Sequence, residues 1–216
     1  MEPVRNRLLH PRGGTYAHLM NLDRRRRDIP VIDGGFTDDQ LAELVNTASS
    51  AHFESQDLER GAFTARRRAV VDEPWITELV WRVVSPHLGR PAEWFGSPGT
   101  PRLSPPVGAW HFDGCNPRSR LYAYTAGGAF SEHEDEPWRP SPRRRSLLTL
   151  LAYLPTDDCV GGETVIDGEV VAAQPGRIVL FDHGLLHEGK PVERGRKMVL
   201  RNDIVAIGPD GTLPNG

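Results

Sequence analysis

The feature that most limits the fold is a change of patterning near Arg118. Before this point apolar residues recur at helical spacing, and from there to about residue 206 short apolar or alternating runs are separated by turn residues. Asp167-Gly168, between Val165-Ile166 and Val170-Val171, is typical of a two-residue β-hairpin with a type I′ turn. Helices first and many short strands afterwards predict a mainly β protein with flanking helices, an antiparallel barrel or jelly roll.

Two helices are expected in the first half of the chain. Thr37 is a suitable N-cap, Gln40 three positions later completes a capping box, and apolar residues follow at helical spacing. A second helix is expected to begin near Pro74, because proline is favoured in the first helical turn. Residues 53–70 are polar and weakly patterned, so we assign no element there. Residues 31–90 are therefore expected to form helical support for the barrel.

Length and composition predict one globular domain over residues 1–216. Within it, residues 1–30 are expected to be irregular and residues 118–206 to form the barrel. The Pro- and Gly-rich stretch 90–108 is expected to be a long loop beside a binding site. The net charge of -3 gives no overall positive potential that would favour binding of nucleic acid.

Cysteine usage and hydropathy bear on the compartment. The chain has two cysteines and no C-x-x-C motif, which argues against a disulfide framework or a cysteine zinc site. The sequence shows no apolar leader at its start and no run approaching the ~20 apolar residues of a membrane span. We expect a cytoplasmic protein that does not enter a membrane.

The main chemical motif is His133-Glu134-Asp135, taken together with His187. Two histidines and one carboxylate hold one face of an octahedral iron(II) and leave the other face open for substrate and oxygen. Residues i and i+2 of a strand point the same way, so His133 and Asp135 can reach one metal while Glu134 faces away. The sequence therefore predicts a non-haem iron site, although an H-x-D motif alone is weak evidence.

Three blocks of sequence carry a family resemblance. They read RLYAYTAGGAFSEHED (120–135), SLLTLLAYLPTDDCVGGET (146–164) and QPGRIVLFDHGLLHEGKPVERGRKMVLR (174–201). In this order they resemble the iron(II)- and 2-oxoglutarate-dependent dioxygenases of the prolyl 4-hydroxylase type. The resemblance covers residues 118–206, with a weaker helical match over 31–90.

The resemblance implies a double-stranded β-helix, a cupin-like jelly roll, and assigns His133, Asp135 and His187 to iron. Lys197, ten residues after His187, matches the family's basic residue for the distal carboxylate of 2-oxoglutarate. Tyr124, nine residues before His133, matches the tyrosine that helps to hold this co-substrate. Arg201 shares a strand face with Lys197 and is our second choice for the same carboxylate, or for an acidic group on the substrate.

The activity that the resemblance implies is hydroxylation of an unactivated C–H bond in an amino acid, peptide or natural-product substrate. The cofactors are Fe(II), 2-oxoglutarate and O2, with ascorbate as reductant, and the co-products are succinate and CO2. A carboxylate at position 135 favours hydroxylation over halogenation, because family halogenases lack it. Glu163-Thr164 after the two glycines departs from the strict prolyl hydroxylase pattern and leaves a peptidyl-proline substrate in doubt.

Several histidines and polar residues compete for roles. His111-Phe112-Asp113 is a second H-x-D motif, but it lacks the GG-x-F lead-in found before His133. His183 competes with His187, and the H-x-x-x-P-V-x-x-G-x-K tail favours His187; we expect His183 to lie in the core or behind a metal ligand. His111, Tyr122 and Thr149 are candidate substrate-side residues.

Two other classes of function remain open at this stage. One is a non-catalytic metal- or ligand-binding β-barrel that acts as a sensor or partner module. The other is a nucleic-acid demethylase of the AlkB type, whose R-x5-R tail is missing here, because Arg194, Arg196 and Arg201 are separated by 2, 5 and 7 positions. The sequence determines neither the substrate nor the oligomeric state.

Overall fold

The computed structural model describes residues 29–55, 66–91, 94, 110–156 and 158–208. Most of the first 30 residues, and most of the loop expected at 90–108, lie outside the described residues. Among the described residues no helix combines the length and the apolar character that crossing a membrane requires.

Both predicted helices form. Helix α1 spans Asp38–Ser50 and α2 spans Pro74–Val84, followed by the 3-10 helix η1 at Ser85–His87. The capping box is confirmed: the Gln40 N–H donates to Thr37 Oγ1 at 3.2 Å, and the Thr37 N–H donates to Gln40 Oε1 at 2.9 Å. These bonds satisfy two donors that a helix start leaves without partners.

The strands form two main antiparallel sheets and one short ribbon. The larger sheet runs β1 (Val31–Ile32), β11 (Ile178–Asp182), β7 (Arg144–Leu154), β14 (Arg196–Ile207), β5 (Ser119–Thr125), β3 (Arg66–Val71) and β2 (Glu54–Ser55), with β4 (His111–Cys115) paired to β14. The smaller sheet runs β10 (Glu169–Val171), β9 (Thr164–Ile166), β12 (His187–Gly189) and β6 (Phe130–His133). The ribbon pairs β13 (Val192–Arg194) with β8 (Val160–Gly161).

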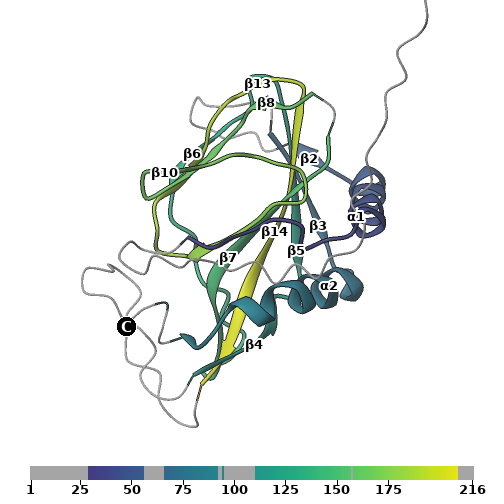
Figure 1. Cartoon of the computed structure of the whole chain (residues 1–216). Coiled ribbons are helices and arrows are strands. Elements are labelled where there is room, and N and C mark those ends of the chain that lie inside the picture. Colours follow the sequence, from purple (N-terminus) through teal and green to yellow (C-terminus); the bar gives the residue numbers. More distant parts are fainter. Residues whose placement is uncertain (1–28, 56–65, 92–93, 95–109, 157, 209–216) are drawn as a thin grey trace, which may run out of the picture.

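The two faces of the larger sheet support two hydrophobic cores. Along β7, Leu148 and Leu150 pack toward the helices, whereas Leu151 and Tyr153 pack into the barrel between the sheets. This alternation is the period of two that a strand imposes on its side chains. Figure 1 shows both helices on one side of β3, β5 and β14, with β6 and β10 on the other. The expected jelly roll with helices packed outside is confirmed.

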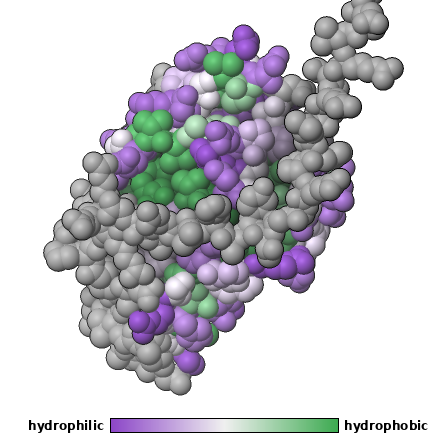
Figure 2. Space-filling view, viewed as in Figure 1, coloured by the Kyte–Doolittle hydropathy of each residue, from purple (hydrophilic) through white to green (hydrophobic). Residues whose placement is uncertain are grey.

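The predicted hairpin is also confirmed. Strands β9 and β10 pair across Asp167 and Gly168, whose φ angles are 48° and 85°. Positive φ at both central positions defines the type I′ turn, which matches the right-handed twist of the strands. On β10 beyond this turn Val170 is 67% exposed, and Figure 2 shows apolar surface gathering over this part of the barrel.

The stretch expected to be helical support contains strands as well. Strand β3, in the region to which we assigned no element, pairs with β5 from Arg66 opposite Tyr124 to Val71 opposite Ser119. Buried positions at Arg66, Ala69 and Val71 do not follow strict alternation, and one of them is an arginine. Apolar periodicity therefore missed this strand. His111-Phe112-Asp113 also lies on a strand, β4, which extends the sheet to before residue 118.

Candidate metal and co-substrate site

The two metal-site histidines face each other across neighbouring strands. His133 is the last residue of β6 and His187 the first of β12, and they are direct partners in the pairing of these strands. We expected His133 and Asp135 to lie on one strand, but β6 ends at His133. Asp135 lies two residues beyond it, where its N–H donates to the His183 carbonyl oxygen at 2.9 Å.

His133, Asp135 and His187 bring their ligand atoms within 4.8 Å of one another. His133 Nε2 lies 3.8 Å from Asp135 Oδ1, and His187 Nε2 lies 3.5 Å from Asp135 Oδ2. In the part of the chain that the structure describes, this is the only group of His, Cys, Asp and Glu side chains arranged to hold a metal ion. The three residues chosen from the H-x-D and His187 pattern thus lie together in space.

The backbone orients both imidazoles with Nε2 toward the centre. His133 Nδ1 lies 2.8 Å from the Ser131 carbonyl oxygen, and His187 Nδ1 lies 2.9 Å from that of Leu185. A carbonyl oxygen only accepts, so each Nδ1 donates its proton and Nε2 is the nitrogen that faces a metal. Burial lowers the pKa of His187, which keeps this imidazole neutral at physiological pH.

The Asp135 carboxylate is held in its ionised form. Burial raises the pKa of Asp135, but the Arg201 charge, the neighbouring His187 and the Thr149 hydrogen bond lower it overall. Arg201 Nη2 lies 2.9 Å from Oδ1, and Thr149 Oγ1 donates to Oδ2 at 2.5 Å. Two neutral imidazoles and one carboxylate are the donor set of non-haem iron(II) oxygenases, so these residues fit ferrous iron.

Lys197 supplies a buried cation in the same cavity. It lies on β14 directly opposite Tyr124 of β5 and is only 5% exposed. Its Nζ donates to the Gly162 carbonyl oxygen at 2.5 Å and lies 5.3 Å from the centre of the Tyr124 ring. Burial lowers the pKa of Lys197 to about 8, so the ammonium still predominates at neutral pH.

The paired glycines at the end of β8 make room for this lysine. Gly161 and Gly162 have φ angles of 73° and 72°, a conformation that strains other residues. A Cβ on Gly162 would lie 3.1 Å from Lys197 Cδ, and one on Gly161 would lie 2.8 Å from the Pro191 carbonyl oxygen. The Gly-Gly motif is therefore needed for the chain to pass this close to Lys197.

One cavity of about 120 Å³ connects these groups between the two sheets. Its lining includes the three metal-site residues, Lys197, Arg201, and the aromatic side chains of Tyr122, Tyr124 and Phe130. The structure thus brings together most of the residues that the sequence singled out.

Two candidate substrate-side residues lie elsewhere. His111 is exposed on β4 opposite Ile207, six positions along β14 from Arg201. Its H-x-D partner Asp113 pairs with Arg144 at 3.2 Å. Thr149 is wholly buried behind the Asp135 carboxylate and is not part of the cavity lining.

Arg201 is committed to carboxylates of the protein itself. Its Nη2 lies 2.9 Å from Asp135 Oδ1 and 3.1 Å from Asp203 Oδ1. Burial lowers the pKa of Arg201, but Asp203 and Asp135 raise it overall. Among the described residues Lys197 has no such ion pair within 4.0 Å. Of the two cations in the cavity, Lys197 is therefore the one left for a ligand.

Arg66 is a site neighbour that the sequence reasoning missed. It is 5% exposed, and its guanidinium lies 3.7 Å from the centre of the Phe130 ring, whose centre is 4.0 Å from that of His133. Its Nε and Nη1 have no hydrogen-bond partner among the residues that the structure describes. The arginine run at 66–68 followed by Ala69-Val70-Val71 was the available signal, because a strand there places alternate arginines on opposite faces.

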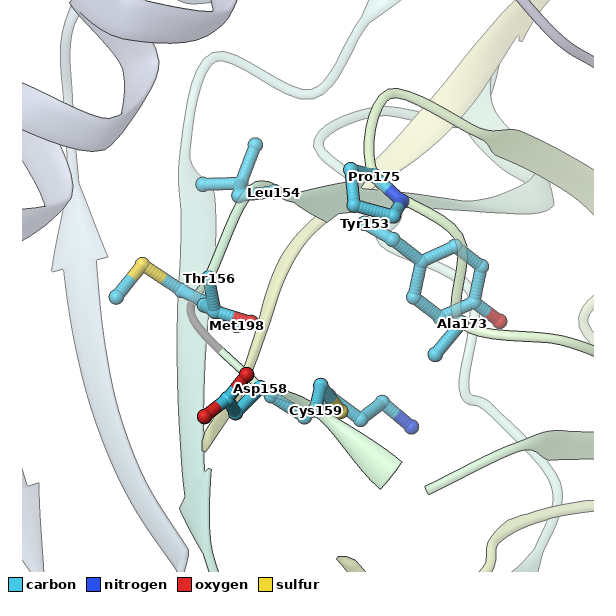
Figure 3. A pocket seen from close by; sticks show the side chains of 9 residues that line it. Tyr153, Leu154, Thr156, Asp158, Cys159, Ala173, Pro175 and Met198 are labelled. Carbon is cyan, nitrogen blue, oxygen red and sulfur yellow. The ribbon is translucent and has the colours of Figure 1, made fainter. Parts of the chain in front are cut away.

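A second cavity, of about 230 Å³, shares Lys197 with the first. Figure 3 shows Tyr153 and Pro175 on one side of it, with Asp158 and Cys159 on another. The Tyr153 hydroxyl donates to Thr164 Oγ1 at 2.8 Å, and Thr164 lines the first cavity. Lys197 therefore lines both spaces, and Tyr153 links the lining of the second to that of the first through Thr164.

Comparison with known proteins bears on this arrangement. The sequence profile of the 2OG-Fe(II) oxygenase superfamily matches residues 119–202, which include all three metal-site residues and Lys197. Over this segment the chain is therefore similar to 2OG-Fe(II) oxygenases. The match ends one residue after Arg201 and begins at the first residue of β5, so it follows the barrel strands rather than the helices. No curated protein matches the chain by sequence.

Solved structures of prolyl hydroxylases are similar to this chain in fold. The viral collagen prolyl hydroxylase of Paramecium Bursaria Chlorella virus-1, solved with 2OG, is 18% identical, with a TM-score of 0.53 over 84% of this chain and 96% of that one. A Trichoplax adhaerens prolyl hydroxylase, solved with a hypoxia inducible factor peptide, is 17% identical, with a TM-score of 0.56 over 82% and 83%. A Pseudomonas putida prolyl-4-hydroxylase is 16% identical, with a TM-score of 0.53 over 82% and 91%.

These likenesses establish a shared fold. Together with the family match they confirm the resemblance to prolyl 4-hydroxylase-type dioxygenases inferred from the three sequence blocks, and the jelly roll that it implied. The substrates named for the similar structures belong to those proteins.

Proposed function

We propose that this oxygenase uses Fe(II), 2-oxoglutarate and O2 to hydroxylate an unactivated C–H bond of an amino acid, peptide or natural-product substrate. Succinate and CO2 are the co-products, and ascorbate serves as reductant in vitro. The observation that carries the proposal is one cavity that holds a His-His-Asp ligand set and a buried cation, Lys197, which has no ion pair with a carboxylate in the described part of the chain.

His133, His187 and Asp135 would hold the iron. The backbone bonds at Nδ1 direct both Nε2 atoms inward, and Arg201 and Thr149 keep the carboxylate ionised and fixed in direction. When bound, iron and 2-oxoglutarate supply the oxidising chemistry, in which O2 is consumed and one oxygen atom enters the substrate. The protein's part is to orient these groups and to exclude water.

Lys197 would bind the distal carboxylate of 2-oxoglutarate. A charge-assisted hydrogen bond from a buried ammonium is strong, because little water competes for it. The Gly162 carbonyl oxygen holds Nζ in place, and Tyr124 lies beside it with a hydroxyl whose pKa is raised by burial, so that it remains a donor. Arg201 would stabilise Asp135 rather than the co-substrate.

The substrate would enter on the side of His133, which is the more exposed of the two histidines. Its side chain is 25% exposed, against 7% for His187. Tyr122 and Phe130 line the same cavity and offer apolar and aromatic surface. Such a wall suits the carbon skeleton of a small substrate or a peptide side chain.

Turnover and binding should be measured separately. Purified protein with Fe(II), ascorbate and 2-oxoglutarate is expected to form succinate slowly without substrate. A mass-spectrometric screen of amino acids, peptides and cell extract is expected to show a gain of one oxygen that depends on 2-oxoglutarate. Absence of both turnover and binding of Fe(II) and 2-oxoglutarate would refute the proposal.

The same measurements separate the other two classes. Metal-dependent binding of 2-oxoglutarate with no turnover on any substrate would support a non-catalytic barrel. Loss of methyl groups from methylated DNA or RNA in the assay would support a nucleic-acid demethylase.

A further inference from the structure

A chain of buried side chains leads away from the Asp135 carboxylate. Thr149 Oγ1 lies 2.5 Å from Asp135 Oδ2 and 2.8 Å from His183 Nδ1. On the other side of the imidazole, His183 Nε2 lies 2.8 Å from Ser146 Oγ. Thr149, His183 and Ser146, which we call the relay, are all wholly buried. Their three contacts therefore form without competition from water.

The distances imply where the protons of the relay lie. A hydroxyl oxygen 2.5 Å from an ionised carboxylate must place its proton between the two oxygens, as in a charge-assisted O–H···O⁻ bond. The Thr149 hydroxyl has one proton, and it donates this proton to Asp135. Thr149 Oγ1 must therefore accept a hydrogen bond from His183, so the proton of the imidazole lies on Nδ1. Nε2 then accepts the proton of Ser146. In each hydrogen bond of the relay the donor is therefore the group that lies farther from Asp135.

The far end of the relay is tied to the segment that follows the metal-binding strand. The Trp138 N–H donates to Ser146 Oγ at 2.8 Å, and the Ser146 N–H donates to the Trp138 carbonyl oxygen at 2.9 Å. These two bonds close the base of residues 138–146. The segment begins three residues after Asp135, so the chain itself and the relay both connect it to the carboxylate.

We propose that the relay orients the Asp135 carboxylate for metal binding and couples that orientation to the position of residues 138–146. Thr149, His183 and Ser146 are positioning residues, because none of them lines the cavity. The inference rests on the metal site of the proposed function. It adds a path by which a ligand on residues 138–146 would change the metal site.

Burial makes a purely structural role costly. An imidazole and two hydroxyls without water need every hydrogen bond to be made, and apolar side chains of the same shape would avoid this requirement. Every polar side-chain group of the relay has a hydrogen-bond partner, and the Thr149 hydroxyl donates its proton to the metal-site residue Asp135. A partner that orients a ligand commonly affects metal affinity by roughly 10- to 100-fold.

The first experiment compares Thr149→Val with Thr149→Ser, using Co(II) as the probe and no 2-oxoglutarate. Calorimetry is expected to show Co(II) affinity lowered by roughly 10- to 100-fold in Thr149→Val. Thr149→Ser keeps the hydroxyl and is expected to restore affinity close to wild type. The Co(II) absorption spectrum should change in Thr149→Val alone, which a loss of stability would not produce.

A second pair of variants tests the far end of the relay. Ser146→Ala removes the proton donated to His183, and Ser119→Ala is the matched control. Ser119 is also wholly buried, and its Oγ accepts from Asn202 Nδ2 at 2.8 Å. Ser146→Ala is expected to weaken Co(II) binding, whereas Ser119→Ala is expected to leave it unchanged.

Coupling to residues 138–146 is tested by its reciprocal effect. If the segment influences Asp135, then a metal on Asp135 must influence the segment by the same free energy. Zn(II) is expected to slow hydrogen exchange of the Trp138 amide in the wild-type protein and to lose this effect in Thr149→Val. Equal protection in both proteins would overturn the coupling.

The outcomes separate this inference from the proposed function. If wild-type protein binds no divalent metal, the metal site and the relay are both overturned. If wild type and Thr149→Val bind Co(II) equally, the relay is overturned while the oxygenase proposal stands. Equal weakening by Ser119→Ala and Ser146→Ala would also overturn it, because the effect would then reflect general destabilisation.

Discussion

Replacement of Lys197 by methionine separates binding of the co-substrate from stability of the fold. Burial lowers the pKa of Lys197 from 10.5 to about 8, so keeping its ammonium in this site costs about 3 kcal/mol of folding free energy at neutral pH. Methionine has a similar length and carries no charge. Its cost is the unsatisfied Gly162 carbonyl oxygen, about 1–3 kcal/mol. We therefore expect Lys197→Met to be about as stable as the wild-type protein.

The effect on 2-oxoglutarate should be much larger. Removal of one partner from a buried, hydrogen-bonded charge pair costs about 2–5 kcal/mol, which corresponds to a loss of affinity from about 30-fold to several thousand-fold. The measurements are the KM for 2-oxoglutarate in succinate formation, Co(II) affinity by calorimetry, and the free energy of unfolding in denaturant. Only the KM for 2-oxoglutarate should change strongly, because Lys197 contacts the Gly162 carbonyl oxygen and the rings of Tyr124 and Tyr153 rather than the metal-site residues.

Lys190 provides a matched control for Lys197. Its side chain is 46% exposed and pairs with Glu188 at 2.6 Å, so Lys190→Met removes the same group from the surface. A KM for 2-oxoglutarate that stays near the wild-type value in Lys197→Met would refute the assignment of this lysine. A rise in KM with Arg201→Met alone would transfer the role to Arg201.

Three further predictions concern the metal site and its cations. His133→Ala and His187→Ala are each expected to abolish Co(II) binding in calorimetry, and His111→Ala to leave it intact; equal loss in all three would contradict the choice of H-x-D motif. Affinity for 2-oxoglutarate is expected to fall by about tenfold per pH unit above 8, because Lys197 with its pKa of about 8 must be charged to bind the carboxylate. An affinity that stays constant up to pH 9.5 in titrations would argue against this role of Lys197. Arg201→Met leaves buried carboxylates without their cation and should lower the free energy of unfolding by about 3–5 kcal/mol, unlike Lys197→Met; unchanged denaturation midpoints would count against this ion pair.

Local patterns were enough to predict many of the elements. The capping box at Thr37, the helix that begins at Pro74 and the Asp167-Gly168 hairpin all form as expected. In each case the pattern concerns residues within a few positions of one another. Hydrogen bonds between near neighbours and the alternation of faces act on the same short scale, so the sequence alone was sufficient.

Strands with polar or short patterns could not be predicted in this way. Strand β3 buries Arg66 against an aromatic ring, so its buried positions are not all apolar residues. Strand β6 stops at His133 because Asp135 forms its backbone bond with His183 rather than with a neighbouring strand. Both outcomes depend on partners more than 40 residues away in the chain.

The sequence by itself was sufficient to select His133, Asp135, His187, Lys197 and Tyr124, because residue type and spacing identify groups that a family resemblance can assign. Only the tertiary structure distinguished the surroundings of the two cations. Lys197 and Arg201 share one face of β14, but Arg201 meets Asp135 and Asp203 whereas Lys197 meets a carbonyl oxygen. The relay behind Asp135 is likewise visible only in three dimensions. A buried charge or hydroxyl takes its function from the groups that surround it, and the register of distant strands decides which groups those are.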